Sequence, residues 1–336
     1  MRPREAQHSE PEAVFFDAVV KCCTYVPYLH NFLVGRILFD ADAAAQSGRA
    51  TVQKRIAEAI GVTPLGLAPS PVYSLIYRSG VDAFGRSRAL RCPHYISDSG
   101  RCGIWRNRNS ICATWFCKHV RGHLGYRFWR DGLQRLLQAV EMDLARWCVL
   151  ELEFGDESLR LLVANGDWGF EAGTVSGDSI DNRVDQRARA STWGKWHGRE
   201  QEFYRRCGEL VSQMDWTDVL AVCGAEALGY ARLTQEAYHQ LRSDAIPTKL
   251  RAGPFYVAHT SEAVLRVNTY SPYDPLDVPE TVMQLLRYFD GRPTADALAA
   301  IADKRGVSLD AALVRKMTDF KLLVDPEGPI DTRQRT

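Results

Sequence analysis

The chain has 336 residues, 46% of them hydrophobic and 25% charged, which is enough for ordinary buried cores and for two or three domains. Its 42 basic and 41 acidic side chains leave a formal net charge of +1, so no global attraction to nucleic acid or to an anionic membrane surface is expected. The N-terminus is polar, and charges interrupt every apolar run well short of the ~18 residues that a membrane-spanning helix needs. We therefore expect a cytoplasmic protein with neither a membrane nor a nucleic-acid partner.

The first quarter of the chain is predicted to be helical up to a loop. A short helix is expected from Pro11, leading into the adjacent thiols Cys22 and Cys23. Further helices are expected over residues 31–40 and 52–60. Three prolines between positions 64 and 71 then indicate a loop, and strand signals are weak in this region.

Four cysteines form a tight block after this loop, with the spacing Cys92-x9-Cys102-x9-Cys112-x4-Cys117. The block is dense in Gly, Pro, Asn, Ser and Asp, so irregular backbone is expected. Crowded thiols in a chain without secretory features more plausibly bind metal than form disulfides, because thiolates are soft, strong ligands. The sequence thus predicts a metal site with Cys22, Cys23, Cys92, Cys102, Cys112 and Cys117 as candidate ligands.

The type of metal is weighed from the surroundings of the thiols. The paired C-x2-C knuckles of structural zinc sites are missing, yet four thiolates suffice for zinc or for a cubane iron–sulfur cluster. Aromatic side chains flank the thiols and would shield a redox cluster, although they could equally fill a small core (Tyr25, Tyr95, Trp105, Trp115 and Phe116). Six basic residues and one acid, Asp98, lie between positions 91 and 121, a balance that favours thiolates. We favour iron–sulfur over zinc, and a metal-free thiol set comes third.

These motifs resemble the YkgJ-type cysteine-cluster family, described as zinc- or iron-chelating proteins, over roughly residues 15 to 120. The resemblance is carried by the adjacent cysteine pair, Cys-Pro-His-Tyr at 92–95, Gly-Arg-Cys-Gly-Ile-Trp at 100–105, Asn-Ser-Ile-Cys at 109–112 and Phe-Cys at 116–117. It implies the same six cysteines as ligands. Many members carry another cysteine before the adjacent pair, where this chain has Val19 and Val20.

The cysteine arrangement also resembles that of the flagellin lysine-N-methylases. This second resemblance implies, as an alternative, a protein-modifying activity that depends on S-adenosylmethionine. The chain shows no glycine-rich Rossmann motif for that cofactor.

The other histidines and cysteines have plainer interpretations. His119 and His123 stand four apart and would share a helical face, but ordinary polar side chains are the favoured interpretation. His94 is a candidate hydrogen-bond donor to a thiolate. The remaining thiols are expected to be isolated and inert (Cys148, Cys207 and Cys223).

The middle of the chain is predicted to be helical, with one long polar interruption. Apolar residues recur at three- and four-residue steps over 133–147, which is typical of a core-facing helix. Residues 165–199 are expected to form a loop or lid, and 202–241 to be helical again.

The C-terminal part is predicted to contain a strand over 264–267, a helix over 282–289, a turn over 290–293, helices starting near Thr294 and Ser308, and a strand over 322–324. It loosely resembles the PqqD-like winged-helix modules, which implies a peptide or protein substrate as partner. Duplex binding is not favoured, because the candidate recognition helix mixes Arg315 and Lys316 with acidic residues.

Together these features predict a mainly α protein with an irregular cysteine-rich metal-binding domain over 11–130, a helical region completing the core over 131–250 and a small winged-helix-like domain over 254–328. The expected function is a metal-dependent role in modifying a protein, peptide or small molecule. A non-catalytic, zinc-stabilised docking protein is the competing class. No nucleophile, phosphate-binding or paired-carboxylate motif identifies catalytic residues.

Overall fold

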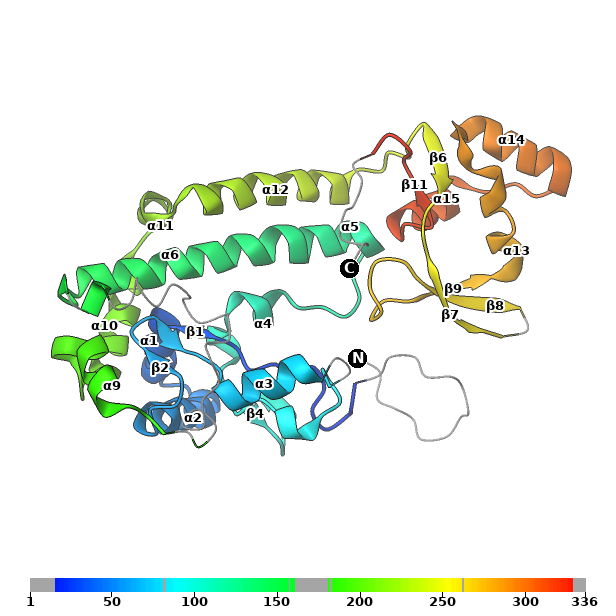
Figure 1. The fold of residues 1–336 in the computed structure, drawn as a ribbon. Helices are drawn as coiled ribbons and strands as arrows, with labels where there is room; N and C mark the ends of the chain where they lie inside the picture. Colours follow the sequence, from blue (N-terminus) through cyan, green and yellow to red (C-terminus); the bar gives the residue numbers. More distant parts are fainter. Residues whose placement is uncertain are drawn as a thin grey trace. The chain divides into compact units, whose positions relative to one another are not determined.

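The structure, a computed structural model, describes residues 16–80, 83–156, 158–160, 181, 183–261 and 263–328. The described chain is mainly helical, as predicted (Figure 1). It divides into two compact units, which we call the cysteine unit (16–115 and 134–231) and the C-terminal unit (116–133 and 232–328). Within these ranges no helix combines the length and the apolar character needed to cross a bilayer.

The cysteine unit is built from short strands and from helices of very different length. Its first part contains β1 (Leu29–His30), α1 (Asn31–Phe39), η1 (Ala43–Ala45), α2 (Gln46–Ala57), β2 (Val62–Thr63), β3 (Gly66–Leu67), α3 (Pro71–Ser79), η2 (Arg88–Leu90), β4 (Tyr95–Ile96), β5 (Arg101–Cys102), η3 (Trp105–Asn107) and α4 (Ser110–Thr114). Its second part contains α6 (Arg135–Glu151), α9 (Gln186–Trp193), η5 (Gly194–Trp196), α10 (Glu200–Gln213), α11 (Trp216–Val222) and the start of α12 (Ala225–Arg242). The strands form one sheet of order β1-β3-β2 and the hairpin β4-β5.

Helix α1 is the centre of this unit's core and confirms the helix predicted over 31–40. Seven of its nine residues are buried, and it crosses α10 at Gly35. A Cβ atom at Gly35 would lie 2.0 Å from the Tyr204 carbonyl oxygen and 2.8 Å from the Gly208 nitrogen, so only glycine permits this crossing. The side-chain amide of Asn31 donates to the carbonyls of Pro64 (3.0 Å) and Ala145 (2.9 Å), which satisfies a buried polar group at the start of the helix.

Two predictions for the first quarter are wrong. The described end of the helix expected from Pro11, residues 16–24, consists of turns, in which the Asp17 carboxylate accepts hydrogen bonds from the backbone of Val19 (2.7 Å). The expected proline loop contains α3. Ser70 caps this helix by accepting a hydrogen bond from the Tyr73 N–H (3.2 Å), and a proline stands in its first turn.

The prediction of a loop or lid over 165–199 is wrong for residues 186–196. Most of the preceding part of that range lies outside the described residues. Residues 186–196 form α9 and η5, with Asp185 as the helix cap. Trp193 is 1% exposed and packs edge-on against Phe203, with ring centroids 5.6 Å apart. Burial of Trp193 therefore places this segment against the core. No local periodicity in the sequence predicts that burial.

The C-terminal unit contains α5 (Gly122–Tyr126), most of the π-helix η4 (Arg127–Gln134), the end of α12, β6 (Lys249–Ala252), β7 (Tyr256–Thr260), β8 (Val264–Asn268), β9 (Leu276–Pro279), α13 (Glu280–Met283), η6 (Leu286–Tyr288), β10 (Asp290–Pro293), α14 (Thr294–Arg305), α15 (Ala311–Asp319) and β11 (Leu323–Val324). Its strands form two antiparallel sheets, β10-β6-β11 and β7-β8-β9. Their inner faces and the helices enclose a separate apolar core that includes Leu250, Ile301 and Met317.

Several details of this unit differ from prediction. Residues 290–293 form strand β10 and not only a turn, because they pair with β6. The helix expected over 282–289 is split into α13 and η6. The last helix is capped by Asp310, which accepts from the Leu313 N–H (2.7 Å), and not by Ser308; the start of α14 at Thr294 is confirmed.

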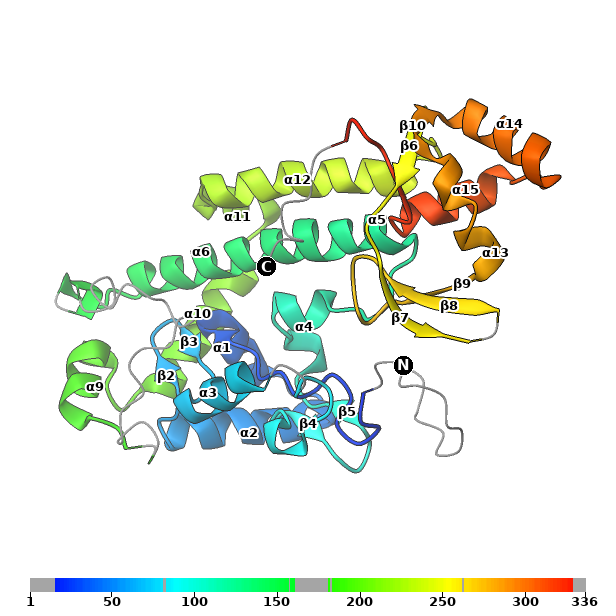
Figure 2. The ribbon, with the colours of Figure 1, turned by 45° about the vertical axis from the view of Figure 1, so that its right-hand side comes forward.

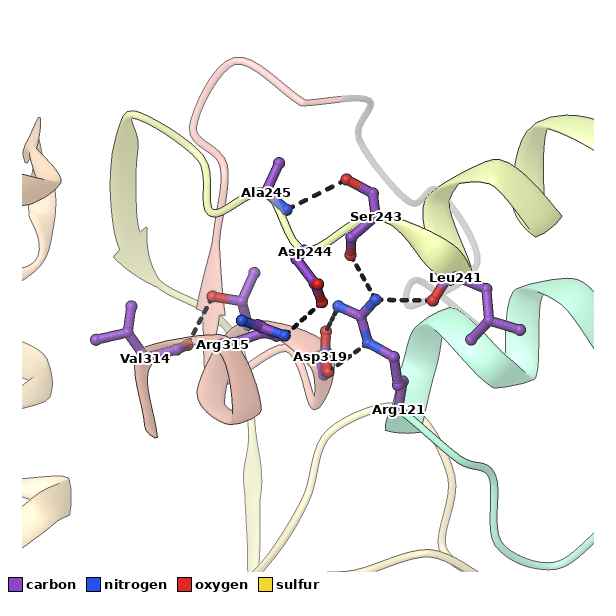
Figure 3. A network of polar contacts seen from close by, with 9 residues as sticks. Arg121, Leu241, Ser243, Asp244, Ala245, Val314, Arg315 and Asp319 are labelled. Atoms are coloured by element: carbon purple, nitrogen blue, oxygen red, sulfur yellow. Dashed lines mark hydrogen bonds and ion pairs between the residues drawn. The ribbon is translucent and has the colours of Figure 1, made fainter. Parts of the chain in front are cut away.

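Arg121 ties three segments of the C-terminal unit together (Figure 3). Its guanidinium donates to both carboxylate oxygens of Asp319 (2.9 and 2.8 Å) and to the carbonyls of Leu241 (2.7 Å) and Ser243 (2.5 Å). The two charged side chains are only 18% and 9% exposed. The short segment that follows the cysteine block is thereby anchored to α15 and to the end of α12.

Candidate metal centre

The adjacent cysteines lie in the turns near the start of the described chain, at residues 18–24. The backbone N–H of Cys92 donates to the carbonyl of Cys23 (2.8 Å), which joins the two cysteine-bearing segments directly. The next carbonyl, that of Thr24, accepts from the Tyr73 hydroxyl (2.6 Å) on α3. Cys22 and Cys23 are therefore held at the start of the cysteine block by backbone contacts.

Cys102 is positioned by the hairpin β4-β5, which Figure 2 shows next to α2. Tyr95 pairs with Cys102 in the hairpin, and the Gly103 N–H donates to the His94 carbonyl (2.8 Å). The hairpin touches α2 at Gly48, where a Cβ atom would lie 2.1 Å from the Gly103 carbonyl oxygen. Two glycines thus allow the backbone of the cysteine block to lie directly on a helix.

Cys112 lies in the first turn of α4, and hydrogen bonds to the side chains of Asn109 and Glu141 hold this turn in place. The Asn109 side chain caps the helix by accepting from the Cys112 N–H (3.0 Å) and also donates to the Tyr25 hydroxyl. Glu141 of α6 accepts from the Ser110 N–H (2.7 Å) and hydroxyl (2.8 Å). A third cysteine-bearing segment is in this way attached both to the core and to the turn after the adjacent pair.

Two of the thiols have the same backbone environment. Burial raises the pKa of Cys92 and of Cys102, and the backbone N–H of His94 and of Ile104, respectively, works against that rise. In both cases the donor is two residues further along the chain. Such N–H donors stabilise a negatively charged sulfur, which is the form that binds metal.

Five thiols lie close enough to interact electrostatically, namely Cys22, Cys23, Cys92, Cys102 and Cys112. A hydrogen bond from the Cys23 thiol lowers the pKa of Cys22 to about 7, and the same bond raises the pKa of Cys23. Burial raises the pKa of Cys92 to about 12, and burial and the neighbouring thiols also raise that of Cys112. Crowding of this kind disfavours five separate thiolates and is relieved when a cation binds them.

Three basic side chains interact with this thiol group. Lys21 acts on Cys22, Arg55 acts on Cys92, and Arg108 acts on three thiols (Cys22, Cys102 and Cys112). The predicted local excess of positive charge is thus partly directed at the sulfurs. Arg108 itself is placed by stacking on the Trp105 ring, 3.5 Å from the ring centroid.

His94 does not have the role that the sequence suggested for its ring. Its Nδ1 atom is 2.8 Å from the Thr51 hydroxyl, which donates to the Gly48 carbonyl (2.7 Å) and must therefore accept from the histidine. The Nε2 atom is buried without a hydrogen-bond partner among the described residues. Burial and the charge of Arg55 lower the pKa of His94 to about 3, so the ring is neutral.

Four cysteines are not part of this group of five. Cys117 lies in the C-terminal unit and is half-buried. Cys148 and Cys207, expected to be isolated, are neighbours in the core: the Cys148 sulfur is 3.9 Å from the Cys207 carbonyl oxygen, and both side chains are fully buried. Cys223 is half-buried, and none of the nine cysteines forms a disulfide.

The two histidines after the block do not share a helix, because α5 begins at Gly122 and His119 precedes it. Both rings instead pack against the same tyrosines of the C-terminal unit, Tyr126 and Tyr270. His119 is 8% exposed. This arrangement supports the interpretation as partly buried side chains.

The donor set suits a thiolate-bound metal, although the thiols are not yet arranged around a common point. Among the described His, Cys, Asp and Glu side chains, no group of three or more has the geometry of a metal site. Four of the five thiols are only half-buried, which leaves a path for an ion. A backbone hydrogen bond already joins the segments that carry Cys23 and Cys92.

Sequence reasoning missed the contribution of α2. Gly48, Thr51 and Arg55 follow one another at steps of three and four residues, so they lie on one face of this helix, and each contacts the cysteine block or its histidine. That spacing was the available signal. Comparison with known proteins adds nothing, since no family model, curated protein or solved structure matches the chain.

Proposed function

We propose that the cysteine unit binds a metal through thiolates, as the YkgJ-like motifs imply, with an iron–sulfur cluster preferred over zinc. The observation that carries the proposal is that five thiols from four chain segments lie near enough to interact electrostatically. Nearby positive charges and the half-exposed sulfurs support it as well. Cys22, Cys23, Cys92, Cys102 and Cys112 are the proposed ligands, and Cys117 remains a candidate.

The proposal is tested by metal analysis of protein purified without oxygen. Wild-type protein should contain iron and sulfide and absorb near about 400 nm; stoichiometric zinc in a colourless protein would identify zinc at the same thiolates. Cys112→Ser should lose most of the metal, because it removes a ligand. Cys223→Ser is the matched control, since that thiol is also half-buried but lies outside the group.

Equal metal content in the two variants would exclude Cys112 as a ligand. Wild-type protein that binds neither zinc nor a reconstituted cluster would end the proposal itself.

We further propose that the C-terminal unit holds an extended peptide or protein segment, which the metal centre helps to modify. The support is strand β7, which has only β8 as a neighbour among the described strands and is therefore the edge of its sheet. Phe255, Tyr256 and Val257 are 41%, 70% and 36% exposed along this edge. An edge strand with exposed apolar side chains can pair with an incoming extended chain.

Selection of random peptides on the full-length protein tests this second proposal. Selected peptides should bind Tyr256→Lys at least about tenfold more weakly in fluorescence anisotropy, because a charge on the edge opposes strand addition. Val307→Lys is the control, since Val307 is also an exposed apolar residue (43%) but lies away from the sheet. Failure to select any peptide, or equal weakening by both variants, would argue against the edge as the binding site.

A further inference from the structure

Arg55 is a buried cation without a carboxylate partner. Its side chain is 8% exposed on α2, and none of the described acidic residues forms an ion pair with it. One guanidinium nitrogen donates to the carbonyl of Ala68 (2.5 Å), whereas Nη1 has no hydrogen-bond partner among the described residues. An arginine cannot lose its charge to escape this situation.

The acidic groups that interact with Arg55 are the thiol of Cys92 and the hydroxyl of Tyr204, and both are uncharged when protonated. Leaving a charge buried and uncompensated is among the most unfavourable arrangements in a protein interior. In contrast, Arg121 of the C-terminal unit, also largely buried, has a carboxylate on two of its nitrogens. Arg55 therefore lacks an anion that its position demands.

Arg55 lies on the face of α2 that contacts the cysteine block. It lies one turn after Thr51, which holds the ring of His94, and two turns after Gly48, on which the hairpin of Cys102 rests. Arg55 interacts electrostatically with Cys92, so conversion of that thiol to a metal-bound thiolate would supply the guanidinium with a counter-charge.

We propose that Arg55 is the buried counter-charge of a metal centre whose net charge is negative, that is, a centre bound by thiolates alone. The inference rests on the proposed metal-binding function and adds to it the charge of the centre. A tetrahedral zinc with four thiolates and a cubane cluster with four thiolates both carry net negative charge, whereas a zinc with two thiolates and two neutral histidines is neutral. Arg55 is thus a positioning residue that favours the all-thiolate class.

The test compares zinc affinity, measured by competition with a chromophoric chelator under reducing conditions, in wild-type protein and three variants. Arg55→Met should lower the affinity by about 10- to 100-fold, the range seen when an outer partner of a metal ligand is removed. Arg55→Lys keeps the charge and should stay within a few-fold of wild type. Lys54→Met removes the same charge from the neighbouring, 73% exposed position and should leave the affinity unchanged.

A merely structural role of Arg55, holding the Ala68 carbonyl, predicts a different pattern. In that case Arg55→Met would lower the thermal stability of metal-free and zinc-bound protein equally and leave the affinity unaltered, which would overturn the inference. As counter-charge, the residue should stabilise the zinc-bound form selectively. If Arg55→Met does not fold, Arg55→Gln, which keeps an N–H donor without the charge, takes its place in the same comparison.

The reduction potential gives a second readout where a cluster is bound. Loss of a neighbouring positive charge disfavours the added electron, so Arg55→Met should shift the potential to more negative values while Lys54→Met should not. An unchanged potential would contradict the inference. Wild-type protein that binds no metal at all would instead refute the proposed function, so the two failures are distinguishable.

Discussion

Buried arginines show how this protein treats charge at the level of single residues. Arg121 donates four hydrogen bonds within the C-terminal unit, and two of them go to the carboxylate of Asp319. Arg55 donates one hydrogen bond, to the Ala68 carbonyl, and interacts electrostatically with the thiol of Cys92. Because the free energy of a buried charge depends on its counter-charge, Arg121 stabilises its unit, whereas we propose that Arg55 responds to a bound metal.

Arg121→Met should destabilise the C-terminal unit by about 3 kcal/mol or more, because it leaves the 9% exposed carboxylate of Asp319 without its partner. Thermal unfolding would show the loss, and hydrogen exchange should localise it to α5, α15 and the end of α12.

Arg199→Met is the matched control for this substitution. Arg199 forms an ion pair with two hydrogen bonds to Glu202 (2.9 and 2.6 Å), but both side chains are about half exposed. Water solvates the partners of such a pair once it is broken, so the variant should be close to wild type in stability. Similar losses in both variants would show that burial does not control the strength of the Arg121 pair.

Helix crossings decide the packing at the level of elements. The contact of α1 with α10 depends on Gly35, and that of α2 with the hairpin β4-β5 depends on Gly48. In both places backbone atoms approach more closely than any side chain would allow. The sequence pattern predicted α1 as a helix, but it gave no sign of which face would meet a second backbone.

Gly35→Ala should destabilise the cysteine unit by about 3 kcal/mol, because the added methyl group meets the rigid backbone of α10. Gly229→Ala, in α12, is the control: nothing lies within 4 Å of a Cβ atom there, and alanine should stabilise the helix by roughly 0.5–1 kcal/mol. Opposite shifts of the unfolding midpoint are expected. A stabilising Gly35→Ala would mean that the crossing of the two helices is looser than described.

Elements with a strong local signal were predicted well, and those that depend on distant contacts were not. Helix α6 has a regular apolar stripe and α14 starts at Thr294, and both helices form as expected, although Thr294 does not cap its helix. Segment 186–196 carries a polar composition, yet Trp193 fills the core and the segment is helical. Strand β10 exists only because β6 lies beside it. Pairing and burial of this kind are absent from any local window of sequence.

At the scale of the whole molecule, the 46% apolar content is enough to fill the apolar cores of both units. The formal net charge is close to zero, at +1. The cysteine unit and the C-terminal unit do not coincide with the three expected ranges. The cysteine block up to Trp115 and most of the helical middle share one core. The reason is that Ile104, from the block, and Leu144, from α6, are buried in the same cluster.

The sequence by itself determined that the protein is mainly helical and that its thiols are concentrated in a Gly- and Asn-rich block, because helical periodicity and residue chemistry are local properties. Only the tertiary structure decided which thiols lie near one another: a backbone hydrogen bond joins Cys92 to Cys23, and Cys22 and Cys112 interact electrostatically although they are far apart in sequence. It also decided that Cys148 adjoins Cys207 and that Arg55 is buried opposite Cys92 without a carboxylate. Burial and the identity of a neighbour arise only when the chain packs against itself, and these two properties set the charge that the candidate metal centre can carry.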